Sequence, residues 1–98
     1  MIYGYEDTFI VNSIDEAELE KKEAESITEI EKMNITDDFY KEKLVKCRVY
    51  MLLAREQMEN EGMLEKYRIY EREFNRYLTL AKNNSKIINV SNIPLGRG

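Results

Sequence analysis

The side chains that could carry out chemistry are few and scattered in this 98-residue sequence. It contains no histidine and a single cysteine, Cys47, so the usual general base is missing and the thiol has no histidine partner to activate it. Asp37 and Asp38 are adjacent carboxylates, but catalysis by paired carboxylates needs a shaped cleft that a small helical chain seldom forms. The four glycines are dispersed and form no phosphate-binding loop. We therefore expect no catalytic residue, no cofactor and no metal site.

Two apolar stripes with the same helical spacing define the elements that would position any site. The stripes are Tyr40, Leu44, Cys47, Met51, Ala54 and Met58, and Met63, Tyr67, Tyr70, Phe74, Tyr77 and Ala81. Steps of four and three residues place each set on one face of an α-helix. The break near Gly62 predicts that the second helix folds back on the first as a long antiparallel hairpin. Within its stripe, Cys47 is expected to be a small buried hydrophobe.

The whole chain is predicted to be a single all-α domain of three helices. We expect an extended arm at residues 1–13, a helical core at 14–82 and an extended tail at 83–98. The predicted helices span residues 14–33, 37–60 and 63–82. The first is expected to start at a capping pattern on Ser13, the second to be capped by Thr36 or Asp37, and the third to end at the polar run Asn83-Asn84-Ser85.

The middle helix carries more apolar side chains than one seam requires. Val45, Val49, Leu52 and Leu53 lie off the main stripe, and a helix with one solvated face would not need them. We expect this helix to be central, in contact with both other helices and with a neighbouring subunit.

The tail is the second informative segment. It is rich in β-branched residues and contains the only proline, and its apolar content is too high for a solvated, disordered terminus. Such a tail either folds back on its own helices or adds to another protein as an extended strand, and the small core favours the second. The predicted partner-binding residues are Ile87, Ile88, Val90, Ile93, Leu95 and Arg97.

Charge is distributed unevenly along the chain. Residues 1–38 hold twelve acidic and three basic side chains, whereas residues 39–98 hold seven acidic and twelve basic ones. The acidic half is unsuited to binding phosphates. The asymmetry suits either head-to-tail packing between copies or ordinary solvated helix faces. No apolar run approaches the roughly 20 residues that span a bilayer, and the N-terminus lacks signal-peptide features, so we expect an intracellular origin and no membrane partner.

The layout resembles that of tailed-phage head–tail connector (adaptor) proteins. The resemblance covers residues 14–82: an acidic first helix, a helix that starts at Thr36-Asp37-Asp38 and has an apolar middle at 44–54, and a third helix at 64–74 reached through Gly62. It implies a small helical subunit that assembles as a ring under the portal. The extended tail would dock on the portal, on other head–tail junction proteins or on a neighbouring copy.

The same resemblance implies that DNA passes through the ring without sequence recognition. It also implies a location in the virion, at the head–tail junction, after assembly in the bacterial host cytoplasm. A second interpretation is a small cytoplasmic adaptor or regulator that forms a dimer and binds a partner protein through its helical face.

Overall fold

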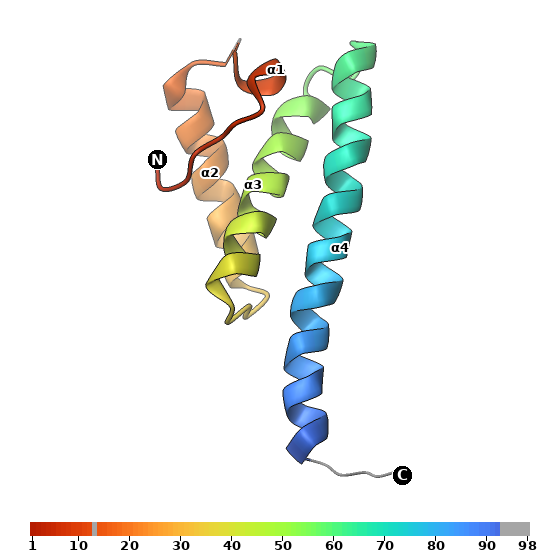
Figure 1. The fold of residues 1–98 in the computed structure, drawn as a ribbon. Helices are drawn as coiled ribbons and strands as arrows, with labels where there is room; N and C mark the ends of the chain where they lie inside the picture. The colour runs from red at the N-terminus through yellow and green to blue at the C-terminus, as the bar shows by residue number, and fades with distance from the viewer. Residues whose placement is uncertain (13, 93–98) are drawn as a thin grey trace.

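The protein is all-helical throughout the part that the structure describes, as the sequence predicts. The structure, a computed structural model, describes residues 1–12 and 14–92, with the backbone alone for residues 84–92. Within these residues there are four helices and no strand (Figure 1): α1 (Thr8–Val11), α2 (Glu16–Glu31), α3 (Asp38–Arg55) and α4 (Glu61–Asn92). The molecule is elongated, with principal extents of 53 × 26 × 19 Å. No helix among the described residues is long and apolar enough to cross a membrane.

The N-terminal arm contains one helical turn, α1, where extended backbone was expected throughout. The backbone N–H groups of Ile10 and Val11 donate to the Asp7 carbonyl at 3.1 and 3.2 Å. The turn places Ile10 in the core with no exposed surface, while Phe9 remains half exposed. Burial of Ile10 therefore outweighs the strand-like preference of this β-branched segment.

Acidic residues cap the next two helices. Asp15 caps α2, accepting a hydrogen bond from the Glu18 backbone N–H at 2.8 Å, so the cap lies two residues beyond the predicted position at Ser13. Of the two expected cap candidates, Thr36 and Asp37, it is Asp37 that caps α3, accepting from the Phe39 and Tyr40 backbone N–H groups. Each carboxylate also lies at the positive end of its helix dipole.

Helix α3 is the central helix, in contact with α1, α2 and α4. Its off-stripe residues Val45, Val49 and Leu53 are at most 1% exposed, and they belong to the same hydrophobic cluster as Ile10 and Ile30. These three side chains were expected to be available for contact with a neighbouring subunit, and for them that expectation is wrong. The arm and α2 already cover the second face of α3.

Gly62 does not form the turn between α3 and α4. It lies in the first turn of α4 with no positive φ, and the Asn60 side chain accepts from the backbone N–H groups of Gly62 and Met63 at 2.8 and 3.2 Å. A Cβ atom on Gly62 would lie 2.5 Å from Cζ of Phe9. The absence of a side chain on Gly62 lets the Phe9 ring of the arm pack closely against the helix.

Helix α4 is longer than predicted at both ends: it begins two residues before the predicted 63–82 helix and is helical for ten residues beyond it. The expected extended tail is wrong for residues 83–92, which are helical, and residues 93–98 lie outside the described residues. Asparagine and serine lower helix propensity by only a fraction of a kcal/mol, so Asn83-Asn84-Ser85 does not stop the helix. The described part of the helix reaches Asn92.

Candidate functional site

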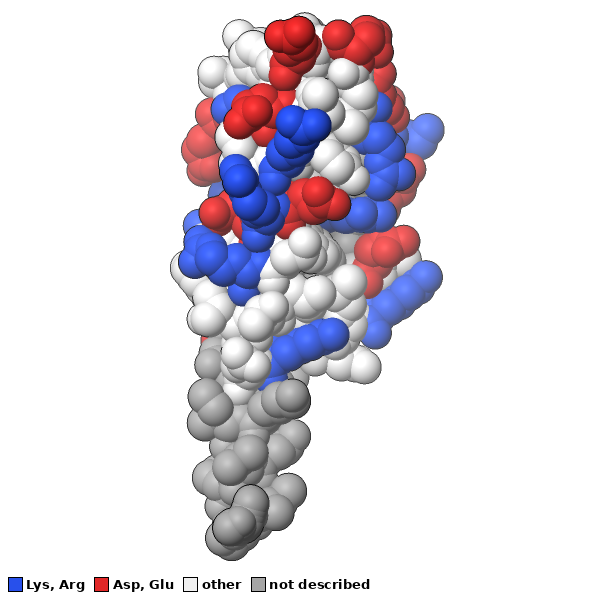
Figure 2. Space-filling model, turned by 90° about the vertical axis from the view of Figure 1, so that its right-hand side faces the viewer, with Lys and Arg blue, Asp and Glu red and all other residues white. Residues whose placement is uncertain are grey.

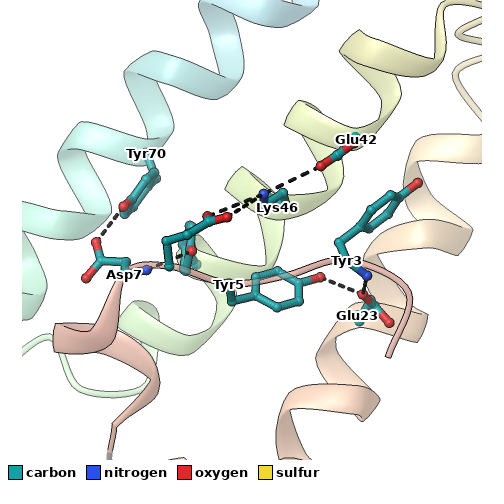
Figure 3. Close-up of polar contacts among 9 residues, drawn as sticks. Tyr3, Tyr5, Asp7, Glu23, Glu42, Lys46 and Tyr70 are labelled. Atoms are coloured by element: carbon teal, nitrogen blue, oxygen red, sulfur yellow. Dashed lines mark hydrogen bonds and ion pairs between the residues drawn. The ribbon is translucent and has the colours of Figure 1, made fainter.

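The N-terminal arm crosses the bundle from α2 to α4 and is held at both ends by a carboxylate (Figure 3). Residues Tyr3, Tyr5 and Asp7 are all partly buried, whereas Gly4 and Glu6 between them are exposed. This alternation is that of extended backbone with one side against the protein. The two carboxylates, Asp7 on the arm and Glu23 on α2, define where the arm lies.

Asp7 joins the arm to α3 and α4. Its side chain is 8% exposed, accepts a hydrogen bond from the Tyr70 hydroxyl and pairs with Lys66 Nζ at 2.9 Å. Its backbone N–H donates to the Tyr50 hydroxyl oxygen at 3.1 Å. Burial by itself raises the Asp7 pKa, but the Tyr70 hydrogen bond and the Lys66 ammonium outweigh it and hold that pKa below its ordinary value. Asp7 is therefore an ionised, fully partnered carboxylate.

Glu23 holds the start of the arm. It is 4% exposed and accepts three hydrogen bonds, from the backbone N–H groups of Ile2 (2.9 Å) and Tyr3 (3.0 Å) and from the Tyr5 hydroxyl (2.8 Å). Burial by itself raises the pKa of Glu23. The three hydrogen bonds that its carboxylate accepts have the larger, opposite effect, so the pKa lies below its ordinary value. A buried carboxylate with three donors fixes the arm's register against α2.

Three tyrosines connect these carboxylates through the core. Tyr50 and Tyr70 are stacked with ring centroids 4.4 Å apart, and the Tyr5 ring meets Tyr50 edge-on at 5.7 Å. Burial, together with the hydrogen bonds to Glu23 and Asp7, raises the pKa of Tyr5 and of Tyr70. Both hydroxyls therefore remain protonated donors.

A groove of about 530 Å³ lies between residues 6–9 of the arm, α3 and α4, and we call it the arm groove. Its lining is mixed: aromatic rings and Cys47 alternate with lysines and carboxylates. The residues are Glu6, Asp7, Thr8, Phe9, Lys43, Lys46, Cys47, Tyr50, Lys66, Tyr70, Glu73 and Tyr77. Lys46 bridges Glu6 on the arm and Glu42 on α3 at 3.4 and 3.5 Å (Figure 3). The groove therefore combines aromatic surface with paired charges.

The groove offers no activated nucleophile. Cys47 is 6% exposed, as predicted for a small buried hydrophobe, and burial raises the pKa of its thiol to about 12. It therefore stays a thiol at neutral pH and reacts slowly. Among residues 1–12 and 14–92, no group of three or more cysteine, aspartate or glutamate side chains is placed to hold a metal ion.

An exposed aromatic cluster lies below the groove, at the start of α3. Phe39 is 57% exposed and contacts the rings of Tyr40 and Tyr77 edge-on. Arg76 lies 4.6 Å above the Tyr77 ring, and Leu80, one turn further along α4, is also exposed. Seen from the α4 side, basic and acidic side chains are intermixed above, and a mostly uncharged area follows below (Figure 2). That view shows no continuous basic surface of the kind that binds nucleic acid.

The predicted partner-binding residues fall at the far end of α4 and beyond it. Ile87, Ile88 and Val90 lie in its last turns, where only the backbone is described. Ile93, Leu95 and Arg97 lie outside the described residues.

The residues that sequence reasoning missed are Asp7, Glu23 and their tyrosine partners. The alternation of Tyr3, Tyr5 and Asp7 is a signal that could have placed the arm on the bundle. Nothing in the pattern of α2 marks Glu23 among its seven glutamates.

Comparisons with protein-family models, with curated proteins and with solved structures find no match to this chain.

Proposed function

We propose that this chain is a structural component of a phage particle, a head–tail connector (adaptor) subunit that assembles as a ring under the portal. One observation carries the proposal: α4 is 32 residues long and continues past the ends of α2 and α3 (Figure 1). At 1.5 Å per residue it is about 48 Å long, nearly the full length of the molecule. A helix that extends beyond its own bundle has faces free to dock on another protein, as a subunit joining two assemblies requires.

In this proposal α3 and α4 form a long antiparallel hairpin that serves as the rigid stem of the subunit. The stacking of Tyr50 on Tyr70 and the burial of Met63 (3% exposed) at the start of α4 support it. The arm adds to this stem, because Asp7 ties it to α4 and Glu23 ties it to α2. A subunit built this way offers fixed surfaces to its neighbours.

The end of α4 and the segment after it are the proposed docking element. Ile87, Ile88, Val90, Ile93, Leu95 and Arg97 would contact the portal, other head–tail junction proteins or a neighbouring copy. The chain would act in the virion, at the head–tail junction, after assembly in the host cytoplasm. An acidic chain of net charge −4 suits a channel that lets DNA pass without recognising its sequence.

Contacts between copies in the ring would be electrostatically complementary. The exposed acids of α2 lie on one flank of the bundle, and the exposed arginines Arg68, Arg72 and Arg76 lie on α4. Head-to-tail packing brings unlike charges together, and closed rings arise from such heterologous contacts.

The exposed aromatic cluster favours a second candidate function, a dimeric adaptor or regulator. Phe39, Tyr77 and Leu80 form an apolar surface on the helical face, and aromatic residues are frequent anchors in protein interfaces. A two-fold contact through this cluster would leave the end of α4 free.

Native mass spectrometry of the full chain, alone and mixed with portal rings from the same genome, tests both candidates. The connector proposal expects a ring, or binding of many copies to the portal, and loss of portal binding when the chain is ended at Asn83. Ala substitution of Phe39 is the matched control, since it removes the aromatic cluster and leaves α4 whole. A stable dimer that ignores the portal and is broken by Phe39→Ala would overturn the connector proposal in favour of the adaptor.

A further inference from the structure

We propose that the arm groove is a peptide-binding site whose occupant is the segment 93–98, Ile93-Pro94-Leu95-Gly96-Arg97-Gly98, of a second copy of this chain. The inference takes from the proposed function only that copies contact one another. The new element is the pair of surfaces that meet: the arm groove of one copy and the segment 93–98 of another.

The chemistry of the groove matches that of the segment. The residues that line it include the aromatic side chains of Tyr50, Tyr77 and Phe9, and aromatic-lined grooves are common receptors for extended segments that contain proline. Pro94 restricts its own backbone and that of the preceding residue to conformations suited to such docking. Ile93 and Leu95 would supply apolar side chains to contact these rings.

The rim of the groove has a place for the one charged side chain of the segment. Glu6 and Glu73 line it with side chains 78% and 39% exposed, so both carboxylates are accessible to an incoming guanidinium. Glu73 pairs with Arg76 at 2.9 Å, in an exposed contact that an arginine could share. Arg97 is the basic residue that such a rim would select.

Geometry excludes the chain's own segment from the groove. Asn92 is fifteen residues beyond Tyr77 and twenty-two beyond Tyr70, or about 22 and 33 Å along α4. Six residues span at most about 20 Å when fully extended. The segment therefore cannot lie along its own groove, but it is free to enter that of a neighbour, and such an exchange between non-equivalent surfaces is head-to-tail.

A two-by-two binding experiment tests this assignment. A fluorescein-labelled peptide of residues 91–98, natural or with Arg97→Glu, is titrated with the full-length chain, natural or with Glu73→Lys, and fluorescence anisotropy is recorded. We expect the natural pair to bind, each single charge reversal to weaken binding about fivefold, and the double reversal to restore it, because this is the scale of one exposed ion pair. Glu71→Lys is the matched control, an exposed glutamate of the same helix that does not line the groove, and it should leave binding unchanged.

Two outcomes would overturn the inference: absence of saturable binding by the natural peptide, or equal loss of binding with Glu71→Lys and Glu73→Lys. Either would leave the connector proposal standing, since a ring can be held by helix faces alone. Conversely, a chain that binds the peptide with the expected pattern but ignores the portal would sink the connector proposal and keep the groove assignment.

Discussion

Tyr70 on α4 donates its phenolic hydrogen bond to the carboxylate of Asp7, sixty-three residues earlier in the chain. This contact ties the first residues of the protein to its last helix. Lys66, one turn before Tyr70, pairs with the same carboxylate at 2.9 Å. The arm is thus part of the folded unit, and loss of this contact has consequences that can be measured.

Replacing Asp7 with Ala should lower the free energy of unfolding by about 2–3 kcal/mol, because the hydroxyl of Tyr70 and the ammonium of Lys66 lose a charged partner in a mostly buried place. Urea denaturation followed by circular dichroism measures this change. Glu6→Ala is the control, since its side chain is 78% exposed and it should cost little. Equal effects of the two substitutions would contradict the role assigned to Asp7.

Replacing Glu23 with Ala should release the start of the arm without unfolding the helices. Its carboxylate accepts from the backbone N–H groups of Ile2 and Tyr3, so hydrogen exchange at these two amides should accelerate strongly, while exchange in α3 changes little. Glu25→Ala, an exposed neighbour on α2, is the matched control. Unchanged protection of Ile2 and Tyr3 would show that the arm is held by other contacts.

Acidification should destabilise the protein through the same two carboxylates. The pKa values of Asp7 and Glu23 are lowered in the folded state, so their contribution is complete above the ordinary carboxyl pKa of about 4 and is lost as the pH falls through the lower folded-state values. Urea midpoints recorded from pH 7 to pH 2.5 should fall steeply below pH 4. The slope should be shallower in Asp7→Asn and Glu23→Gln variants, and an unchanged slope in both would refute this linkage.

Gly62 and Phe9 should be energetically coupled. Alanine favours the helix over glycine by up to about 1 kcal/mol, but a Cβ atom on Gly62 would lie 2.5 Å from the Phe9 ring, which must then move away. Gly62→Ala should therefore bring no gain in stability in the natural chain and a gain of about 0.5–1 kcal/mol in a Phe9→Ala background. Thermal unfolding of the natural chain, the two single variants and the double variant measures this coupling as a double-mutant cycle. Additive effects would mean that the ring does not pack on Gly62.

Cys47 should be nearly inert toward thiol reagents while the protein is folded. Burial raises its pKa to about 12, so the reactive thiolate is scarce at neutral pH. Its rate of modification by a disulfide reagent should rise by orders of magnitude in urea, in step with unfolding. Rapid modification of the native protein would show that this part of α3 opens readily.

Much of the fold could be predicted because helical periodicity is a local signal. The spacing of the stripes through Leu44, Met51 and Tyr70 placed α3 and the first two thirds of α4, and residue type narrowed the cap of α3 to Thr36 or Asp37. The last ten described residues of α4 were missed because the run of asparagine and serine was interpreted as a stop signal. These residues disfavour a helix only weakly, so the run does not end it.

The residues by themselves determined that the part of the chain that the structure describes is all-helical, that α3 is central and that Cys47 is buried, since these follow from apolar periodicity and residue type. Only the tertiary structure decided what covers the second face of α3, which carboxylates hold the arm, and that the Phe9 ring packs against Gly62. These depend on pairs tens of residues apart, such as Asp7 with Tyr70. No local pattern specifies such a pair, because its energy exists only once the helices have been brought together.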